Sequence, residues 1–208
     1  MSEAFTLWSM PSSGNSYKVR MLLAHLGITY KHREAEAGTG VTTSAEFIAL
    51  NPDSKVPLVQ FDDGFTLRES NAILVYFGLG TKWLPEDRLS HARVMQWMFF
   101  EQYSHEPAIA VRGGILTLEE RVHLRTPEVL GPLLDKGHAA LATMERQLET
   151  TSFLVAEEPT LADICLYAYT HSASTKGGFE MDRFPGINNW LARVSSLPGH
   201  VPLNWLPG

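Results

Sequence analysis

The residues best suited to chemistry lie near the start of the chain, where an apolar run gives way to small polar side chains. The run 5–8 is followed by Ser12-Ser13-Gly14-Asn15, which we call the elbow, and a helical pattern begins near Val19. This order predicts a strand, a polar turn and a helix fringed with hydroxyl and amide groups. Because a helix N-terminus has unsatisfied N–H groups and positive dipole character, it stabilises an anion, and a thiolate is one candidate.

The chain has little sulfur chemistry of its own to offer at such a site. Cys165 is its single cysteine, which excludes an internal disulfide, a CxxC redox pair and a cysteine-rich zinc site. Cys165 also shares an apolar helical stripe with Leu161 and Ile164, so we predict an inert core thiol. Any sulfur chemistry must therefore come from a substrate.

A second candidate feature is the pair Val56-Pro57, which opens a predicted strand ending at Phe61. An X-Pro bond can adopt the cis isomer at a cost of about 0.5 to 1 kcal/mol. A cis bond here would turn the Val56 N–H and C=O outward, where they could pair with the backbone of a bound extended peptide. The alternative is a simple strand start at a sheet edge, where proline is tolerated.

A third candidate feature is the pair Glu69-Ser70, which precedes an apolar helix. A substrate carboxylate could bind the Ser70 N–H and hydroxyl, while an ammonium group of the same substrate could meet Glu69. The pair would therefore suit a zwitterion. The alternative is plain helix capping, with Ser70 as the cap and Glu69 near the positive end of the helix.

The elements that must position these residues follow from hydrophobic periodicity. The strand at 5–8, the helix after the elbow and the alternating segment 28–32 predict a β-α-β unit. Residues 56–67 predict a hairpin that turns at Asp62-Asp63-Gly64, and Ser70-Asn71 is expected to cap the helix that follows.

The second part of the chain shows only helical patterns, beginning with a long one at 89–110. Thr160 and Asp163 resemble a capping box, for which a structural role is sufficient. Helix-breaking glycines and a proline separate the two parts. We predict a domain at 1–80, a linker at 81–88 and a helical domain at 89–208.

Aromatic and charged side chains of the long helical pattern could line a pocket for an apolar ligand. Aromatic clusters on helices are also explained by interior packing, which we weigh more heavily for Trp97 and Phe100. Tyr103 and Arg112 are kept as candidates for a second substrate site.

Composition and charge exclude several classes of function. The 23 acidic and 17 basic side chains give a formal charge of −6 without a Lys/Arg block, which disfavours nucleic acid and anionic membranes as partners. With no signal-peptide pattern and no long apolar span, we expect a cytoplasmic protein. Glu101 and His105 have the spacing of a metal pair, but no third ligand is evident, so no metal is predicted.

Taken together, the motifs resemble the glutathione S-transferase family over nearly the whole chain. They are the elbow with Lys18-Val19-Arg20, the segments 51–57 and 67–73, and Thr160 to Ile164. The resemblance implies a thioredoxin-like N-terminal domain of order β-α-β-α-β-β-α, followed by an all-helical C-terminal domain. It looks most like bacterial serine-type members with zeta-like and nu-like features. The elbow lacks a cysteine, which argues against zeta-type isomerase chemistry.

Family roles can be carried over to this chain residue by residue. The resemblance implies that Ser13 donates a hydrogen bond to the glutathione thiolate and that Asn15 assists or replaces it. The residues that would bind the rest of glutathione are Lys55, Val56, Pro57, Glu69 and Ser70. Which of Ser13 and Asn15 activates the thiol stays open.

The activity that the resemblance implies is transfer of glutathione, as co-substrate, to small hydrophobic electrophiles in detoxification, without a metal. The resemblance also implies a homodimer. Two alternatives remain open: a glutathione-dependent peroxidase or disulfide-bond reductase of the same fold, and a non-catalytic binding or regulatory member of the family.

Overall fold

The computed structural model describes residues 5–207. These residues form two compact units, of which unit 1 comprises 5–79 with 198–207, and unit 2 comprises 80–197. Residues 198–207, the C-terminal tail, lie outside the helical unit, to which the sequence analysis had assigned them. The physical reason is hydrogen bonding between side chains of α1 and backbone carbonyls of the tail, as where the Tyr17 hydroxyl donates to Val201 O at 2.7 Å.

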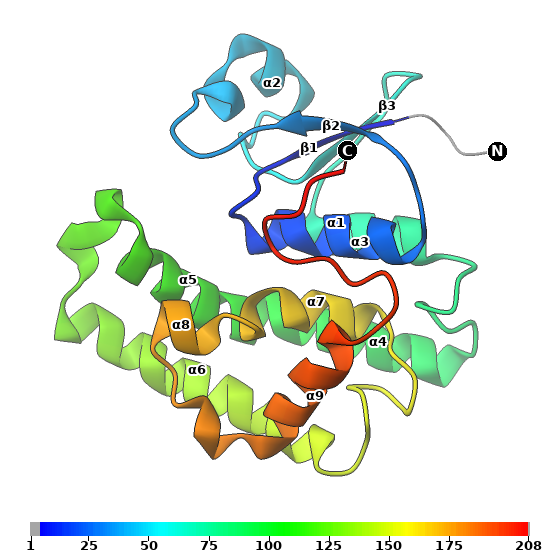
Figure 1. Cartoon of the computed structure of the whole chain (residues 1–208). Coiled ribbons are helices and arrows are strands. Elements are labelled where there is room, and N and C mark those ends of the chain that lie inside the picture. Colours follow the sequence, from blue (N-terminus) through cyan, green and yellow to red (C-terminus); the bar gives the residue numbers. More distant parts are fainter. Residues whose placement is uncertain (1–4, 208) are drawn as a thin grey trace. The chain divides into compact units, whose positions relative to one another are not determined.

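Unit 1 contains a four-stranded sheet in the order β2-β1-β3-β4 (Figure 1). Strand β1 is parallel to β2 and antiparallel to β3, and β3 pairs antiparallel with β4. The predicted β-α-β unit and hairpin are therefore confirmed, although β2 begins later than expected, since Ile28 and Tyr30 pack against the core ahead of the strand. The strands are β1 (Phe5–Ser9), β2 (Lys31–Glu34), β3 (Leu58–Phe61) and β4 (Thr66–Leu67).

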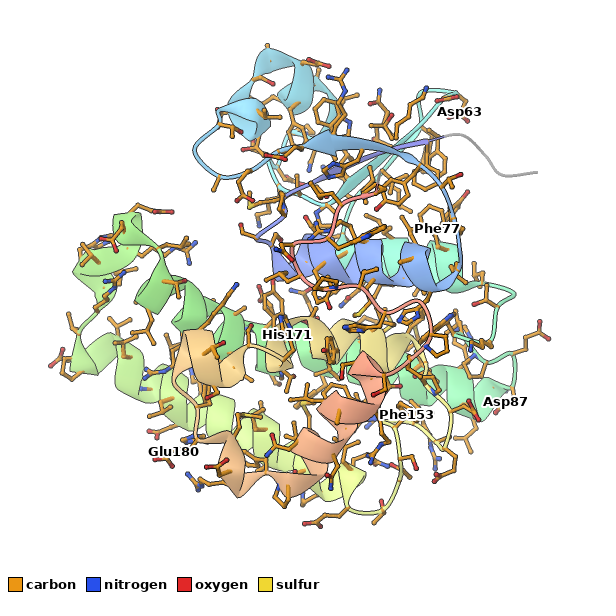
Figure 2. The ribbon with its side chains drawn as sticks, viewed as in Figure 1. Asp63, Phe77, Asp87, Phe153, His171 and Glu180 are labelled. Atoms are coloured by element: carbon orange, nitrogen blue, oxygen red, sulfur yellow. The ribbon has the colours of Figure 1, made fainter. Side chains whose placement is uncertain are left out.

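Side chains point alternately to opposite sides of the strands, and both faces of the sheet are apolar. Phe5 and Val59 face a core that includes residues of α1 (Gly14–His25) and α3 (Ser70–Gly78), among them Phe77, whose ring centre lies 5.0 Å from that of Phe5 (Figure 2). Trp8 and Leu58 face the other way, against Phe47 of α2 (Ala45–Leu50). A short 3-10 turn at Val41–Thr43 precedes α2. The period-2 pattern of the strands thus fixes which helix covers which face.

Unit 2 is built from helices. A π-helical segment at Glu101–His105 joins α4 directly to α5, so the predicted long helix is helical throughout but has one wider turn. No helix among the described residues is long and apolar enough to cross a membrane. The helices are α4 (Arg88–Phe100), α5 (Glu106–Thr117), α6 (Pro127–Leu148), α7 (Leu161–Thr170), α8 (Ala173–Gly177) and α9 (Pro185–Ser195), with 3-10 turns at Glu119–Leu124 and Met181–Arg183.

The predicted capping box begins helix α7 of unit 2. Thr160 N–H donates to the Asp163 carboxylate at 2.8 Å, and the Thr160 hydroxyl accepts from Ala162 N–H at 3.3 Å. The carboxylate of Asp163 also accepts from Trp190 Nε1 at 2.9 Å, which links α7 to α9. This confirms the structural role predicted from the sequence, and Cys165 on the same helix is fully buried, as expected of a core thiol.

Candidate functional site

The elbow lies where the chain leaves β1 and enters α1. Ser13 is the N-cap of α1, and its hydroxyl oxygen accepts a hydrogen bond from Ser16 N–H at 3.2 Å. Ser13 N–H in turn donates to Met10 O at 3.1 Å, which closes the turn. Within residues 5–207, the Ser13 hydroxyl proton has no acceptor, so this hydroxyl can cap the helix and still donate to a ligand.

Ser12 anchors the elbow from its outer side. Its N–H and hydroxyl donate to the Glu36 carboxylate at 3.0 and 2.6 Å. Burial acts to raise the pKa of Glu36, but the hydrogen bonds from Ser12 and from Ala37 N–H outweigh burial and hold this pKa below its ordinary value. The carboxylate therefore favours its charged form while it holds Ser12.

The peptide bond between Val56 and Pro57 is cis, as the second sequence feature allowed. Val56 lies just before β3 and is half-buried, whereas Pro57 is buried. Neither the N–H nor the C=O of Val56 forms a backbone hydrogen bond with another of the described residues. Both groups can therefore pair with an added strand.

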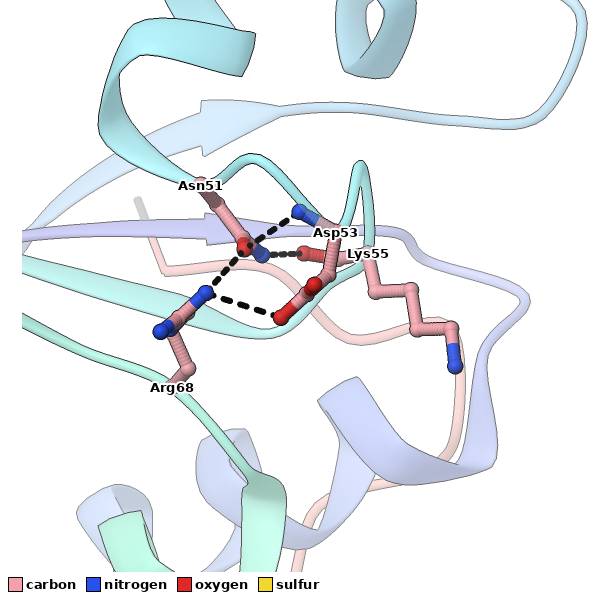
Figure 3. A network of polar contacts seen from close by, with 4 residues as sticks. All are labelled: Asn51, Asp53, Lys55 and Arg68. Atoms are coloured by element: carbon pink, nitrogen blue, oxygen red, sulfur yellow. Dashed lines mark hydrogen bonds and ion pairs between the residues drawn. The ribbon is translucent and has the colours of Figure 1, made fainter.

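A polar network holds the loop before Val56 (Figure 3). Arg68 Nη1 donates to Asp53 Oδ2 at 2.8 Å and to Asn51 Oδ1 at 3.3 Å, while Asn51 Nδ2 donates to Lys55 O at 2.7 Å. The exposed Lys55 side chain extends away from the other three residues (Figure 3). Sequence reasoning gave Asn51 and Arg68 no role, although an Asn-Pro turn is a signal for such a side-chain contact.

Glu69 and Ser70 differ from the capping arrangement expected from the sequence. Ser70 is the first residue of α3, and Glu69 occupies the N-cap position without a side-chain cap. The backbone of Glu69 has a φ of 68°, a left-handed conformation that is strained for a non-glycine residue. Its carboxylate is exposed and has no partner among the described residues, so it is accessible to an ammonium group.

The Ser70 hydroxyl joins this region to the elbow. It donates to Asn15 Oδ1 at 3.2 Å and accepts from Lys18 Nζ at 3.4 Å. Lys18 is fully buried and also donates to Asn71 Oδ1 at 3.3 Å. A lysine in the first turns of an amphipathic helix is usually exposed, so sequence reasoning missed Lys18. The structure thus brings together Asn15 and Ser70, two of the residues singled out from the sequence.

The two candidates in unit 2 lie in different surroundings. Tyr103 is 87% exposed on the π-helical segment. Arg112 donates to Gly177 O and Leu130 O, each at 2.7 Å, and burial lowers its pKa. Arg112 therefore ties α5 to neighbouring backbone, a role not foreseen from the sequence. An open hollow of about 310 Å³ lies between α4 and α6, lined by Gln96, Trp97, Phe100, Thr143, Arg146 and Gln147.

The possible metal pair of the sequence lies in the interior of unit 2. Glu101 accepts a hydrogen bond from Cys165 Sγ at 3.3 Å, and His105 Nε2 lies 2.9 Å from Thr170 Oγ1. Within the described part of the chain, no group of three or more His, Cys, Asp or Glu side chains is arranged to hold a metal ion.

Comparison with known proteins agrees with this architecture. Residues 3–78 match the glutathione S-transferase N-terminal domain and residues 111–193 match its C-terminal domain. The crystal structure of a glutathione S-transferase from Pseudomonas fluorescens is 43% identical, covers 96% of this chain and 98% of its own, and superposes with a TM-score of 0.91.

Two curated relatives match over most of their length. Glutathione S-transferase 1 of Schizosaccharomyces pombe is 26% identical, over 93% of this chain and 92% of its own. The disulfide-bond oxidoreductase YfcG of Escherichia coli is 23% identical, over 88% of this chain and 87% of its own. With a sheet of thioredoxin-like topology, a helical second unit and a full-length match at 43% identity, the chain belongs to the glutathione S-transferase family.

Proposed function

We propose that this chain is a glutathione transferase that holds the glutathione thiol as a thiolate at the elbow and directs it onto a small hydrophobic electrophile. The observation that carries the proposal is the hydrogen bond from Ser70 to Asn15, because it joins the predicted carboxylate site to the predicted thiolate site. The unpaired backbone of Val56 supports it further, since a peptide ligand needs such a partner.

Each residue of the proposed site has a distinct task. The Ser13 hydroxyl and the Asn15 amide donate to the thiolate, and the Val56 backbone pairs with the cysteinyl residue of glutathione. The γ-glutamyl carboxylate binds the Ser70 N–H at the start of α3, because the single hydroxyl proton of Ser70 is donated to Asn15 Oδ1. The ammonium of the same γ-glutamyl group binds Glu69. Pro57 shapes the turn, and the exposed Lys55 reaches toward the peptide.

Activation of the thiol requires a moderate free energy. A thiol with a pKa near 8.5 is mostly protonated at neutral pH, and lowering that pKa by about two units takes about 2.7 kcal/mol. A charge-assisted hydrogen bond together with a helix N-terminus supplies energies of this order. The thiolate sulfur then forms a bond to the electrophilic carbon, and the leaving group departs with the electron pair of the broken bond.

Binding and ionisation test the proposal directly. Isothermal titration should detect glutathione binding, and ultraviolet titration of the complex should show a thiolate at a pH below its usual range. S-methylglutathione is the matched ligand control, because it retains the peptide but has no ionisable thiol. Absence of thiolate absorbance would contradict the proposal, and absence of binding as well would favour the non-catalytic alternative.

A second candidate function is disulfide reduction, which the similarity to YfcG favours. Here the bound thiolate attacks one sulfur of a disulfide, breaks its S–S bond and displaces the other sulfur as a thiolate, which leaves a mixed disulfide with glutathione. A second glutathione thiolate then attacks the glutathione sulfur of the mixed disulfide, which forms glutathione disulfide and releases the substrate thiolate. A panel of aryl halides, peroxides and disulfides separates this activity and peroxide reduction from transfer to electrophiles.

Several finer expectations belong to the same proposal. We keep Tyr103 and Arg112 as candidates for the electrophile site, and detoxification as the role. A homodimer is expected and would be recognised by analytical ultracentrifugation. A cytoplasmic location would be tested by microscopy of the tagged chain.

A further inference from the structure

Arg20 is a buried cation directly beneath the elbow. It lies on α1 and is fully buried. No carboxylate lies within ion-pair distance of it among residues 5–207, and burial lowers its pKa despite neighbouring groups, including Glu36, that act to raise it. Because burying a guanidinium is costly without hydrogen bonds, the positions of its acceptors define its role.

Three of the acceptors belong to the chain leading into the elbow. Arg20 donates to Ser9 Oγ at 3.1 Å, to Met10 O at 3.0 Å and to Pro11 O at 3.0 Å. Met10 O is also the acceptor for Ser13 N–H, the bond that closes the turn. One rigid guanidinium therefore holds three consecutive residues, and its planar geometry fixes their orientation.

The fourth acceptor, Leu203 O, lies in the C-terminal tail. The tail runs along α1 (Figure 1), where Val201 O accepts from the Tyr17 hydroxyl and Pro198 O accepts from His25 Nδ1 at 2.9 Å. All of these residues belong to unit 1. The Arg20 side chain therefore contacts both the tail and the segment that leads into the elbow.

We propose that Arg20 is a positioning residue for the elbow and that it acts by tying the elbow to the C-terminal tail. Its consequence for the thiolate rests on the function proposed above. Loss of the Leu203 contact leaves the buried guanidinium with fewer acceptors, so the guanidinium shifts, and the carbonyls of residues 10 and 11 lose their fixed orientation. Ser13 and Asn15 then move relative to the thiol.

We call the hydrogen bonds that join the elbow to the tail through Arg20 the brace. Amide hydrogen exchange of the unliganded full chain tests the brace independently of glutathione. Arg20→Lys keeps the charge but loses the planar set of donors, and it should accelerate exchange of elbow peptides about tenfold while β3 remains protected. Tyr17→Phe removes one tail contact and leaves the guanidinium intact, and it should accelerate tail and elbow exchange in the same direction by a smaller factor. Arg33→Lys, on the exposed strand β2, is the control and should change neither.

A second readout connects the brace to chemistry. In Arg20→Lys, the thiol pKa of bound glutathione should rise by about half a unit or more, with a smaller rise in Tyr17→Phe. Unchanged elbow exchange in both variants, or equal acceleration in β3, would overturn the proposal. If Arg20→Lys fails to fold, Tyr17→Phe alone tests the proposal. Elbow exchange in Tyr17→Phe at the wild-type rate would then reject the link between the elbow and the tail.

The two proposals can fail separately. If wild type binds glutathione without ionising its thiol, yet both variants loosen the elbow, the proposed function is wrong and the brace stands. If the thiol ionises normally in both variants while the elbow stays protected, the brace is wrong and the proposed function stands.

Discussion

Ser70 Oγ donates a hydrogen bond to Asn15 Oδ1 at 3.2 Å across 55 positions of sequence. Because this bond occupies the amide oxygen, the Nδ2 group of Asn15 is left to donate elsewhere, and it has no acceptor among the described residues. A donor at the entrance of a helix is what a thiolate requires. The orientation of Asn15 is thus set by the hydroxyl of Ser70, the residue whose backbone N–H is proposed to bind the substrate carboxylate.

Asn15→Ala should raise the thiol pKa of bound glutathione by about one unit, the equivalent of one lost hydrogen bond to a charged group. Asn15→Asp should raise it further, because a carboxylate repels the thiolate. Ser13→Ala should also raise it, but with a loss of about 1 kcal/mol in the free energy of unfolding, since Ser13 caps α1. Thiolate titration and urea denaturation measure the two quantities. A pKa unchanged in all three variants would reject this account of activation.

Glu69→Gln should weaken glutathione binding about tenfold, because the amide keeps the shape of the side chain but cannot pair as an anion with the ammonium group. The rate at saturating glutathione should change little, since Glu69 is remote from the sulfur in the proposed binding mode. Asp62→Asn, an exposed carboxylate in the β3–β4 turn, is the control. An equal loss of affinity in both variants would indicate a general charge effect instead.

Glu69→Gly should make the protein more stable and glutathione binding weaker. A φ of 68° is strained for glutamate but accessible to glycine, so removing the strain should add about 1 kcal/mol to the free energy of unfolding. The same change removes the ammonium partner. The unfolding temperature should therefore rise while the affinity for glutathione falls. A decrease in both quantities would show that the backbone of Glu69 is not strained.

His32 should contribute to the pH dependence of stability. Its Nε2 lies 2.8 Å from Ser9 Oγ, and burial, reinforced by Arg20, lowers its pKa below the usual 6.5. The unfolded chain therefore takes up a proton first, so the stability present above pH 6.5 is lost as pH falls through the folded pKa. His32→Gln should flatten the decline in unfolding free energy over that range. His123→Gln, on an exposed turn, is the control, and equal slopes in the two variants would contradict this role.

Features that depend on near neighbours in the chain can be predicted from the amino-acid sequence. The strand, elbow and helix at the start of the chain follow from period-2 and period-3.6 patterns, and Thr160 with Asp163 forms the predicted capping box because its partners are three positions apart. The cis bond before Pro57 was also available to sequence reasoning, since only proline makes that isomer inexpensive.

The pairing of polar groups that are distant in sequence is visible only in the folded chain. Lys18 and Arg20 lie on a helix where charged residues are expected to face solvent, and they are buried because acceptors from other segments offset their desolvation. The C-terminal tail has no hydrophobic period to indicate its partner, and its position depends on hydrogen bonds of its backbone carbonyls, which every residue type possesses. Hydrogen bonds between residues far apart in the sequence leave no local pattern. The residues of the candidate site can therefore be named from the sequence, whereas their contacts follow from the fold.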